Sequence, residues 1–147
     1  TAMIFIDMDH FKEVNDTMGH SMGDHVICDM AQKLQIIFAN FDLVARFGGD
    51  EFCIFVKDIP YETLKNKLEW TVDKLRSTYT NGTEYVDITA SIGAAYCSQE
   101  DADYQFLLDM ADAAVYEAKK KGRDQYIIKN IMTNMTFMEQ NKQIYIN

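Results

Sequence analysis

The chain has 147 residues, of which 48% are hydrophobic and 12% aromatic, so it can form one domain with a buried core but not two of ordinary size. Fourteen basic residues against 23 acidic ones give a net charge of −9. This charge argues against a general nucleic-acid or anionic-membrane surface, because both would be repelled. A small phosphorylated ligand is compatible with it only if metal ions supply positive charge locally.

The cysteines and the hydropathy pattern predict a cytoplasmic domain. Cys28, Cys53 and Cys97 are odd in number and lie in apolar stretches, which indicates buried thiols in a reducing compartment and not a disulfide framework. No apolar run reaches the roughly 18 residues of a membrane span, and no signal peptide opens the chain. We expect any membrane attachment to come from another part of a longer protein.

The first predicted elements are a strand and two helices. Residues 3–8 are short, apolar and β-branched, as in a buried central strand, except for the carboxylate of Asp7 near the end. Helical spacing follows over residues 11–18. Ser21 begins a longer helix with one apolar face that extends to Phe38. We place Cys28 on that face, in the core.

A hairpin and a third helix come next. Residues 42–47 and 51–57 have strand patterns joined at Gly48-Gly49, a pair that can take the positive φ angles of a tight turn. Pro60 fits the first turn of a helix whose buried stripe runs as far as Tyr79.

The remaining pattern is strand, helix, strand. After a turn at residues 81–82, apolar residues alternate with polar or small ones from 86 to 96, the period of a strand with one packed face. Asp103 can cap a long helix that Gly122 ends, and residues 125–129 form the last strand.

This order of elements predicts the fold class. It is β-α-α-β-β-α-β-α-β, which indicates an α+β fold with a ferredoxin-like or polymerase-palm-like sheet of about five mainly antiparallel strands flanked by helices. We place this domain at residues 1–130 and a C-terminal tail or linker at residues 131–147.

The strongest chemical signal is the segment from Arg46 to Phe52, in which Asp50 and Glu51 directly follow two glycines. A hairpin needs only the glycines, although acidic residues in turns are common. In a palm-like sheet the first strand lies beside this hairpin, so Asp7 and Asp50 would converge. Carboxylates at one spot repel unless cations join them. Oxygen ligands favour Mg²⁺ or Mn²⁺, and paired ions suit in-line phosphoryl transfer.

Five short motifs follow one another along the chain in a characteristic order. They are Asp7 to Asp16 with Gly19-His20 and Gly23-Asp24, then Gly48 to Phe52, then Ala90 to Gly93, then Ala111-Asp112 to Tyr116, and last Lys119 with Gly122-Arg123. In this order and spacing they closely resemble the GGDEF family of diguanylate cyclases, over about residues 3–129.

The resemblance implies a metal-dependent enzyme. Asp7 and Asp50 correspond to ligands of two Mg²⁺ or Mn²⁺ ions per active site, assisted by the main-chain carbonyl of Met8, and Gly49 belongs to the substrate site. Glu51 corresponds either to a metal ligand or to the base for the substrate's 3′-hydroxyl, and the sequence leaves both roles open. A purely structural Asp7 is disfavoured, because an unpaired buried carboxylate is costly.

The same resemblance assigns residues that bind the phosphates of GTP. The backbone amides around His10, Phe11 and Lys12 open a helix and can receive phosphate oxygens. Lys119 and Arg123 correspond to the basic pair that holds the terminal phosphates, although cations are favoured at any helix C-terminus.

Asn15 and Asp24 correspond to the residues that bind the guanine base of GTP in the family. An amide can bond the N3 and amino edge of the base, and a carboxylate can accept from N1–H and N2–H₂, a donor pair that adenine lacks. Ser21 and Asp24 also have the spacing of a capping box, so a capping role for Asp24 stays open.

The family reaction joins two GTP molecules into cyclic di-GMP and releases two pyrophosphates. One GTP per domain implies a homodimer, and we expect a regulatory domain in the full-length protein and no contact of this domain with nucleic-acid polymers or membranes. The alternatives are a non-catalytic GTP or cyclic di-GMP sensor, a scaffold domain, and a palm-type cyclase that makes a cyclic mononucleotide.

Two departures from the family pattern affect these expectations. The sequence starts at the first strand, without the helical segment that usually precedes it in the family, which indicates a fragment or a trimmed domain. The product-inhibition motif R-x-x-D reads Ala39 to Asp42 here. We therefore expect no inhibitory product site, although Asp42 is retained.

Overall fold

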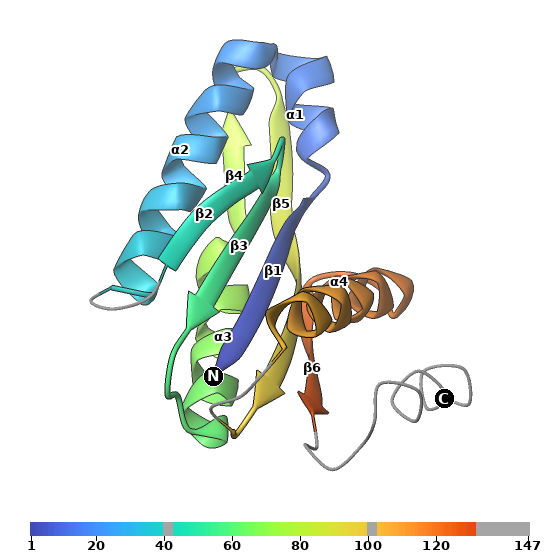
Figure 1. Ribbon diagram of the computed structural model, residues 1–147. Helices are drawn as coiled ribbons and strands as arrows, with labels where there is room; N and C mark the ends of the chain where they lie inside the picture. Colours follow the sequence, from blue (N-terminus) through green and yellow to red (C-terminus); the bar gives the residue numbers. More distant parts are fainter. Residues whose placement is uncertain (40–42, 100–102, 132–147) are drawn as a thin grey trace.

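The structure is a computed structural model that describes residues 1–39, 43–99 and 103–131. Within these ranges a six-stranded sheet is flanked by helices on both faces (Figure 1). The elements in chain order are β1 (Ala2–Asp9), α1 (Phe11–Met18), α2 (His20–Ile37), β2 (Leu43–Gly48), β3 (Glu51–Val56), α3 (Tyr61–Leu75), β4 (Ser77–Thr80), β5 (Tyr85–Cys97), α4 (Tyr104–Lys120) and β6 (Gln125–Ile131).

The sheet has the strand order β2-β3-β1-β5-β4, and β6 also pairs with β5. β1 lies between β3 and β5 and is antiparallel to both. Two strands share the other edge of β5, because β4 pairs antiparallel with residues 85–88 and β6 pairs parallel with residues 91–97. The strand that carries Asp7 is therefore central, as expected.

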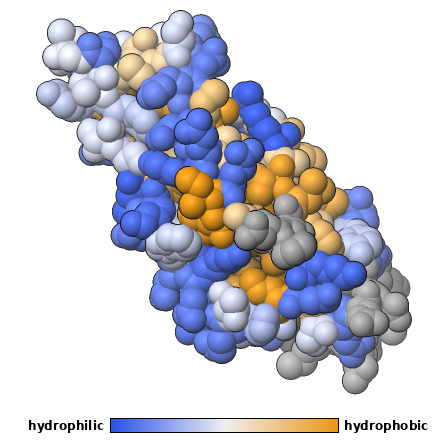
Figure 2. All heavy atoms as spheres, turned by 90° about the vertical axis from the view of Figure 1, so that its left-hand side faces the viewer, coloured by the Kyte–Doolittle hydropathy of each residue, from blue (hydrophilic) through white to orange (hydrophobic). Residues whose placement is uncertain are grey.

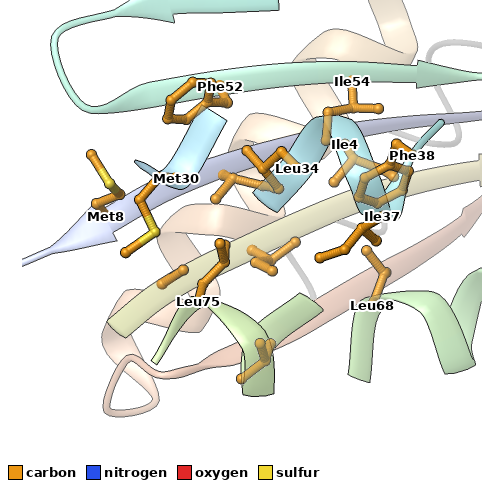
Figure 3. Packing of buried hydrophobic residues seen from close by; sticks show 14 of the residues in the cluster. Ile4, Met8, Met30, Leu34, Ile37, Phe38, Phe52, Ile54, Leu68 and Leu75 are labelled. Carbon is orange, nitrogen blue, oxygen red and sulfur yellow. The ribbon is translucent and has the colours of Figure 1, made fainter. Parts of the chain in front are cut away.

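The larger core lies between the sheet and helices α2 and α3. Side chains alternate along a strand, so Ile4 of β1 points to this face (Figure 3). It packs there with Met30 and Leu34 of α2, with Phe38 directly after α2, and with Leu68 of α3. These five side chains are at most 1% exposed. Burial of side chains this large stabilises the fold by about 1.5–3 kcal/mol each, which holds β1 firmly in place.

Helix α4 covers the opposite face of the sheet. Met3 of β1 and Ala95 and Cys97 of β5 pack there against Leu107 and Ala111 of α4. The sequence pattern of β5 predicted only one packed face. That prediction is wrong from Ser91 onward, because α4 buries the second face of the strand.

Gly93 of β5 allows α4 to approach the sheet closely. A Cβ atom at this position would lie 2.3 Å from both the carbonyl oxygen of Ala111 and the amide nitrogen of Val115. Both are backbone atoms, which cannot turn aside as a flexible side chain could. The separation between sheet and helix therefore depends on the missing side chain of Gly93.

The third helix ends earlier than predicted. Tyr79 lies four residues after Leu75 and so continues the helical spacing, but α3 ends at Leu75 and Ser77–Thr80 form β4. The Tyr79 hydroxyl donates to Asp29 Oδ2 of α2 at 2.5 Å. Aromatic and β-branched residues favour a strand where a partner strand is available, and β5 provides that partner. This pairing adds the strand that the prediction lacked.

Both ends of α4 form as predicted. The Asp103 side chain accepts hydrogen bonds from the amides of Gln105 and Phe106 at 3.0 and 3.3 Å. Gly122 follows the helix with φ +113°, the left-handed conformation that favours glycine after a helix C-terminus.

The prediction of an α+β fold with a palm-like, mainly antiparallel sheet is confirmed, with β6 as a parallel member. Cys28 is exposed, whereas Cys97 is buried and Cys53 half-buried, so the placement of Cys28 in the core was wrong. None of the helices in the described ranges is long and apolar enough to cross a membrane. Asp42 and the expected tail beyond Ile131 lie outside the described residues.

The side of the molecule that carries α2 and β2 shows apolar patches between hydrophilic areas (Figure 2). Ile36, Leu43 and Phe47 are exposed apolar side chains of these two elements. β2 is also the outermost strand of the order β2-β3-β1-β5-β4.

Candidate active site

The carboxylates predicted to converge do so. In the antiparallel register of β1 and β3, Asp7 lies directly opposite Glu51. The amide of Met8 donates to the carbonyl oxygen of Asp50 at 3.2 Å, so the hairpin tip is bonded to the end of β1. Asp7, Asp50 and Glu51 are thereby gathered at one end of the central strands.

The hairpin turn differs from its prediction. Gly48 is the last residue of β2 and pairs with Glu51, so Gly49 and Asp50 form the turn, and neither Gly48 nor Gly49 has a positive φ. The Arg46 guanidinium donates twice to the Gly49 carbonyl, at 2.9 and 3.1 Å. The turn is held by this side chain and not by the left-handed freedom of glycine.

A shift in register between Arg46 and Gly48 leaves Phe47 without a partner on β3. This is a β-bulge, which re-aims side chains near the end of a strand. The exposed Phe47 ring meets the ring of Phe5 edge to face, with 5.4 Å between the centroids.

The electrostatics of the three carboxylates show an excess of negative charge. Burial, followed by the charge of Asp7, raises the pKa of Asp50. Burial also raises the pKa of Glu51, with further contributions from Asp7, Asp50 and Asp112. Carboxylates that repel one another in this way favour a bound cation.

Lys119 supplies one positive charge at this place. Its Nζ is bonded to Asp7 Oδ2, which connects α4 to the end of β1. In the described parts of the chain, no three Asp, Glu, His or Cys side chains already surround a point that could hold a metal ion. The donor set nevertheless fits Mg²⁺ or Mn²⁺ chemically, because it consists of carboxylate oxygens with more negative charge than one ammonium balances.

A cleft of about 340 Å³ opens beside the carboxylates, between β1, the hairpin and α4. Phe5 and Phe47 form part of its wall, and Asp7, Glu51 and Asp112 line it as well. Asp7 and Glu51 are therefore part of the surface of this cleft. The sequence interpretation assigned no role to Asp112 or Phe47, whose positions depend on α4 and on the bulge.

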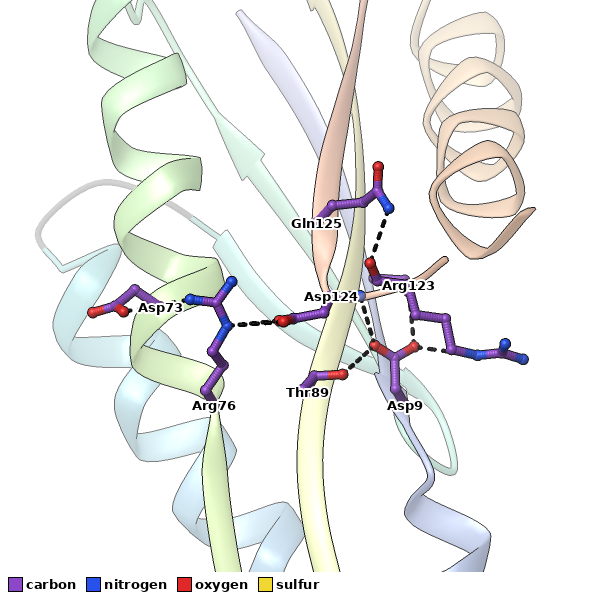
Figure 4. Close-up of polar contacts among 8 residues, drawn as sticks. Asp9, Asp73, Arg76, Thr89, Arg123, Asp124 and Gln125 are labelled. Carbon is purple, nitrogen blue, oxygen red and sulfur yellow. Dashed lines mark hydrogen bonds and ion pairs between the residues drawn. The ribbon is translucent and has the colours of Figure 1, made fainter. Parts of the chain in front are cut away.

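Asp9 binds the loop that carries Arg123, a role that the sequence interpretation missed (Figure 4). Its side chain is buried and accepts hydrogen bonds from Thr89 Oγ1, Ser91 Oγ and the Asp124 amide at 2.6, 2.7 and 3.2 Å. Arg123 Nε lies 3.8 Å from Asp9 Oδ1. The signal was present in the sequence, because Asp7 and Asp9 are two residues apart on one strand and so share a face.

The loop that carries Arg123 is held in an unusual conformation. Arg123 and Asp124 both have positive φ angles, of 64° and 48°, which non-glycine residues adopt at a cost in free energy. Asp9 binds this loop from one side. On the other side, Arg76 Nε donates to both carboxylate oxygens of Asp124 at 2.9 and 3.0 Å (Figure 4). Lys119 and Arg123 are thus both anchored to carboxylates of β1.

The predicted phosphate-binding turn lies between β1 and α1. His10 is the N-cap of α1, with φ 65°, and no side chain caps the helix among the described residues. Phe11 and Lys12 then begin the helix, so their amides lack partners in the preceding turn. The helix starts two residues after Asp9, close in sequence to the carboxylates.

Asn15 and Asp24 come from the two helices that pack together beyond this turn. Gly23 makes that contact possible, because a Cβ there would lie 1.9 Å from Asn15 Oδ1. Helix α2 begins at His20 with Gly19 as its N-cap and no side-chain cap, so the capping-box role left open for Ser21 and Asp24 is excluded. Asp24 is exposed and directly follows Gly23, the residue against which the Asn15 side chain lies.

Comparison with known proteins agrees with this geometry. The family model described as "Diguanylate cyclase, GGDEF domain" matches residues 1–125. The chain belongs to this family. The GGDEF domain is 36% identical over 124 residues to the protein named "Probable diguanylate cyclase DgcC" of Escherichia coli K12, covering 84% of this chain and 33% of that protein. It is 37% identical over 127 residues to "Diguanylate cyclase DosC" of the same strain, covering 84% of this chain and 27% of that protein. The chain thus spans about a third of these curated relatives.

Solved structures share the fold of this GGDEF domain. The active GGEEF domain of a diguanylate cyclase from Vibrio cholerae has a TM-score of 0.78 at 29% identity, over 89% of this chain and 83% of that one. Diguanylate cyclase SiaD of Pseudomonas aeruginosa, solved with its activator SiaC, has a TM-score of 0.77 at 32% identity, over 87% and 49%. The GGDEF domain of DgcB from Caulobacter crescentus, solved with c-di-GMP, has a TM-score of 0.74 at 29% identity, over 88% and 76%.

Proposed function

We propose that this GGDEF domain catalyses the condensation of two GTP molecules into cyclic di-GMP and two pyrophosphates. In each of the two steps a 3′-hydroxyl oxygen bonds to the α-phosphorus of the other GTP, and the bond from that phosphorus to the leaving pyrophosphate breaks. The observation that carries this proposal is the convergence of Asp7, Asp50 and Glu51 at one end of the central strands, with Lys119 beside them.

Asp7, Asp50 and Glu51 would hold two divalent cations, with the Met8 carbonyl as a further ligand. Bound there, Mg²⁺ or Mn²⁺ neutralises the charge that develops on the phosphoryl oxygens. The oxygen-only donor set and the raised pKa values of Asp50 and Glu51 support this assignment. The alternative role for Glu51 is to take the proton of the 3′-hydroxyl, since its carboxylate lines the cleft opposite Asp7.

The other predicted residues bind and orient the nucleotide. The amides of residues 10–12 and the side chains of Lys119 and Arg123 receive the phosphates, and Gly49 leaves room for the substrate at the hairpin tip. A Cβ on Gly49 would meet nothing within 4 Å, so the space above it is open. Asn15 and Asp24 bind the guanine edge.

A symmetric product from one GTP per domain requires two copies of the chain with their sites facing each other. We therefore propose a homodimer as the active unit. We also propose a cytoplasmic location, with residues 1–130 as the catalytic domain and a regulatory domain elsewhere in the full-length protein. SiaD, a relative of similar fold, was solved with an activator protein.

Chromatography of the products after incubation with GTP and Mg²⁺ tests the proposed function. We expect cyclic di-GMP and pyrophosphate in a ratio of one to two. A cyclic mononucleotide would identify a different cyclase. Unchanged GTP together with saturable GTP binding would identify a sensor, and unchanged GTP without binding would identify a scaffold.

Asp24→Ser is expected to weaken the preference for GTP over ATP roughly tenfold or more, because a hydroxyl can both donate and accept where the carboxylate only accepts. Competition between the two nucleotides measures the effect. Asp16→Ser, at an exposed acid of α1, is the matched control. If ATP competed with GTP no better in Asp24→Ser than in the wild type, Asp24 would not be part of the guanine site. The thermal stability of Asp24→Ser should equal that of the wild type, because Asp24 caps no helix.

Cyclic di-GMP is expected not to bind tightly at residues 39–42. Ala39 has neither charge nor hydrogen-bond donors in its side chain, and Asp42 alone would repel a dianionic ligand on a chain of net charge −9. Calorimetric titration with product, with the active site filled by a non-hydrolysable GTP analogue, measures this binding. A submicromolar site that Asp42→Ala abolishes would contradict the expectation.

A further inference from the structure

Lys119 of α4 forms an ion pair with Asp7 of β1. The bond joins Lys119 Nζ to Asp7 Oδ2, and the two side chains are 36% and 13% exposed. The carboxylate is therefore largely withdrawn from water, while the ammonium group keeps access to the solvent. An ion pair of this kind can exchange its cation more easily than one buried in a core.

Lys119 also acts on the other two carboxylates. Glu51 lies directly opposite Asp7 in the strand register, and the carbonyl oxygen of Asp50 accepts a hydrogen bond from the amide of Met8 beside it. One ammonium thus partly compensates three carboxylates. Any divalent cation that binds Asp7 must compete with it.

We propose that Lys119 is an internal counter-ion of Asp7, which a divalent cation displaces, and that the displaced ammonium then binds the phosphates of the nucleotide. This inference rests on the proposed function, because it concerns the same metal and phosphate sites. It predicts coupled binding. A metal ion that binds without nucleotide must break the Lys119–Asp7 ion pair, and a nucleotide that binds without metal must compete with Asp7 for Lys119. Each ligand should therefore raise the affinity of the domain for the other.

The first test measures Mn²⁺ binding to the chain without nucleotide, by electron paramagnetic resonance of the free ion. Lys119→Met is expected to bind Mn²⁺ about fivefold more tightly than the wild type, because the competing cation is gone. Lys119→Arg, which keeps the charge, should resemble the wild type. Lys120→Met is the matched control, since it removes the same charge from the same helix, where Lys120 lies over the Tyr116 ring.

The second test separates release of Lys119 from simple repulsion between Asp7 and phosphate. A non-hydrolysable GTP analogue is titrated calorimetrically in the presence of EDTA. Asp7→Asn is expected to raise its affinity about fivefold in the wild-type background and to have no effect in the Lys119→Met background. An equal gain in both backgrounds would show that repulsion suffices and would overturn the proposal.

The outcomes distinguish this inference from the proposed function. If the wild type makes cyclic di-GMP but Lys119→Met binds free Mn²⁺ no more tightly than Lys120→Met, the exchange is wrong and the function stands. If no variant binds Mn²⁺ and the wild type also fails to convert GTP, both are wrong. Circular dichroism checks that each variant is folded, and Lys119→Gln replaces Lys119→Met if the methionine variant is not.

Discussion

Asp50→Asn is expected to lower the rate of cyclic di-GMP synthesis about a thousandfold or more. Asp50 lies in the hairpin turn beside Asp7, where we place the metal ions, and loss of a bridging carboxylate removes roughly several kcal/mol of transition-state stabilisation. The rate of pyrophosphate release measures the effect. Synthesis at a tenth of the wild-type rate would refute the metal role of this residue.

The fold of Asp50→Asn should be intact. Burial and the charge of Asp7 disfavour the ionised form of Asp50 in the folded state, so a neutral side chain relieves repulsion. The thermal midpoint is therefore expected to equal or exceed that of the wild type. Asp58→Asn is a suitable control for charge, because Asp58 is exposed with φ 53°, a conformation that asparagine tolerates equally well. It should keep full activity.

Gly93→Ala is expected to destabilise the domain by about 3 kcal/mol or more, which for a chain of this size lowers the thermal midpoint by roughly 10 °C. The new Cβ would lie 2.3 Å from backbone atoms of Ala111 and Val115. To accept it, α4 must move away from β5, and Lys119 would move with the helix away from Asp7. Thermal or urea denaturation measures the loss of stability.

Gly49→Ala is the matched control for this variant. Its Cβ meets nothing within 4 Å and its φ is not positive, so its stability should equal that of the wild type. An equal loss of stability in both variants would show that the effect does not depend on the contact with α4. A normal midpoint for Gly93→Ala would show that the helix can shift without cost.

Much of the active site could be predicted from local patterns. Asp7 interrupts an apolar strand and Asp50 follows a glycine turn, and both facts are visible in the sequence because strand periodicity and turn composition are local properties. Asp9 shares a face with Asp7 and could have been found by the same rule. The roles of Lys119 and Arg123 came from the family resemblance, since nothing local indicates which carboxylates they reach.

Other features depended on contacts between distant residues. The periodicity of α3 extends through Tyr79, but pairing with β5 makes that segment a strand. Cys28 lies among apolar residues in the sequence, yet the sheet buries a neighbouring face of α2. Arg46, and not a positive φ at glycine, holds the hairpin turn. In each case several local conformations were compatible with the residues, and packing selected one of them.

The sequence by itself determined the α+β class, the order of the main elements, the carboxylates Asp7, Asp50 and Glu51, and the family. These follow from periods of two and 3.6 residues and from short motifs, which do not depend on how the chain packs. Only the tertiary structure decided that Asp7 faces Glu51, that α4 closes the second face of the sheet over Gly93, and that Lys119 binds Asp7. Each of these depends on register or on close approach between distant segments, where a shift of one residue would exchange the two faces of a strand.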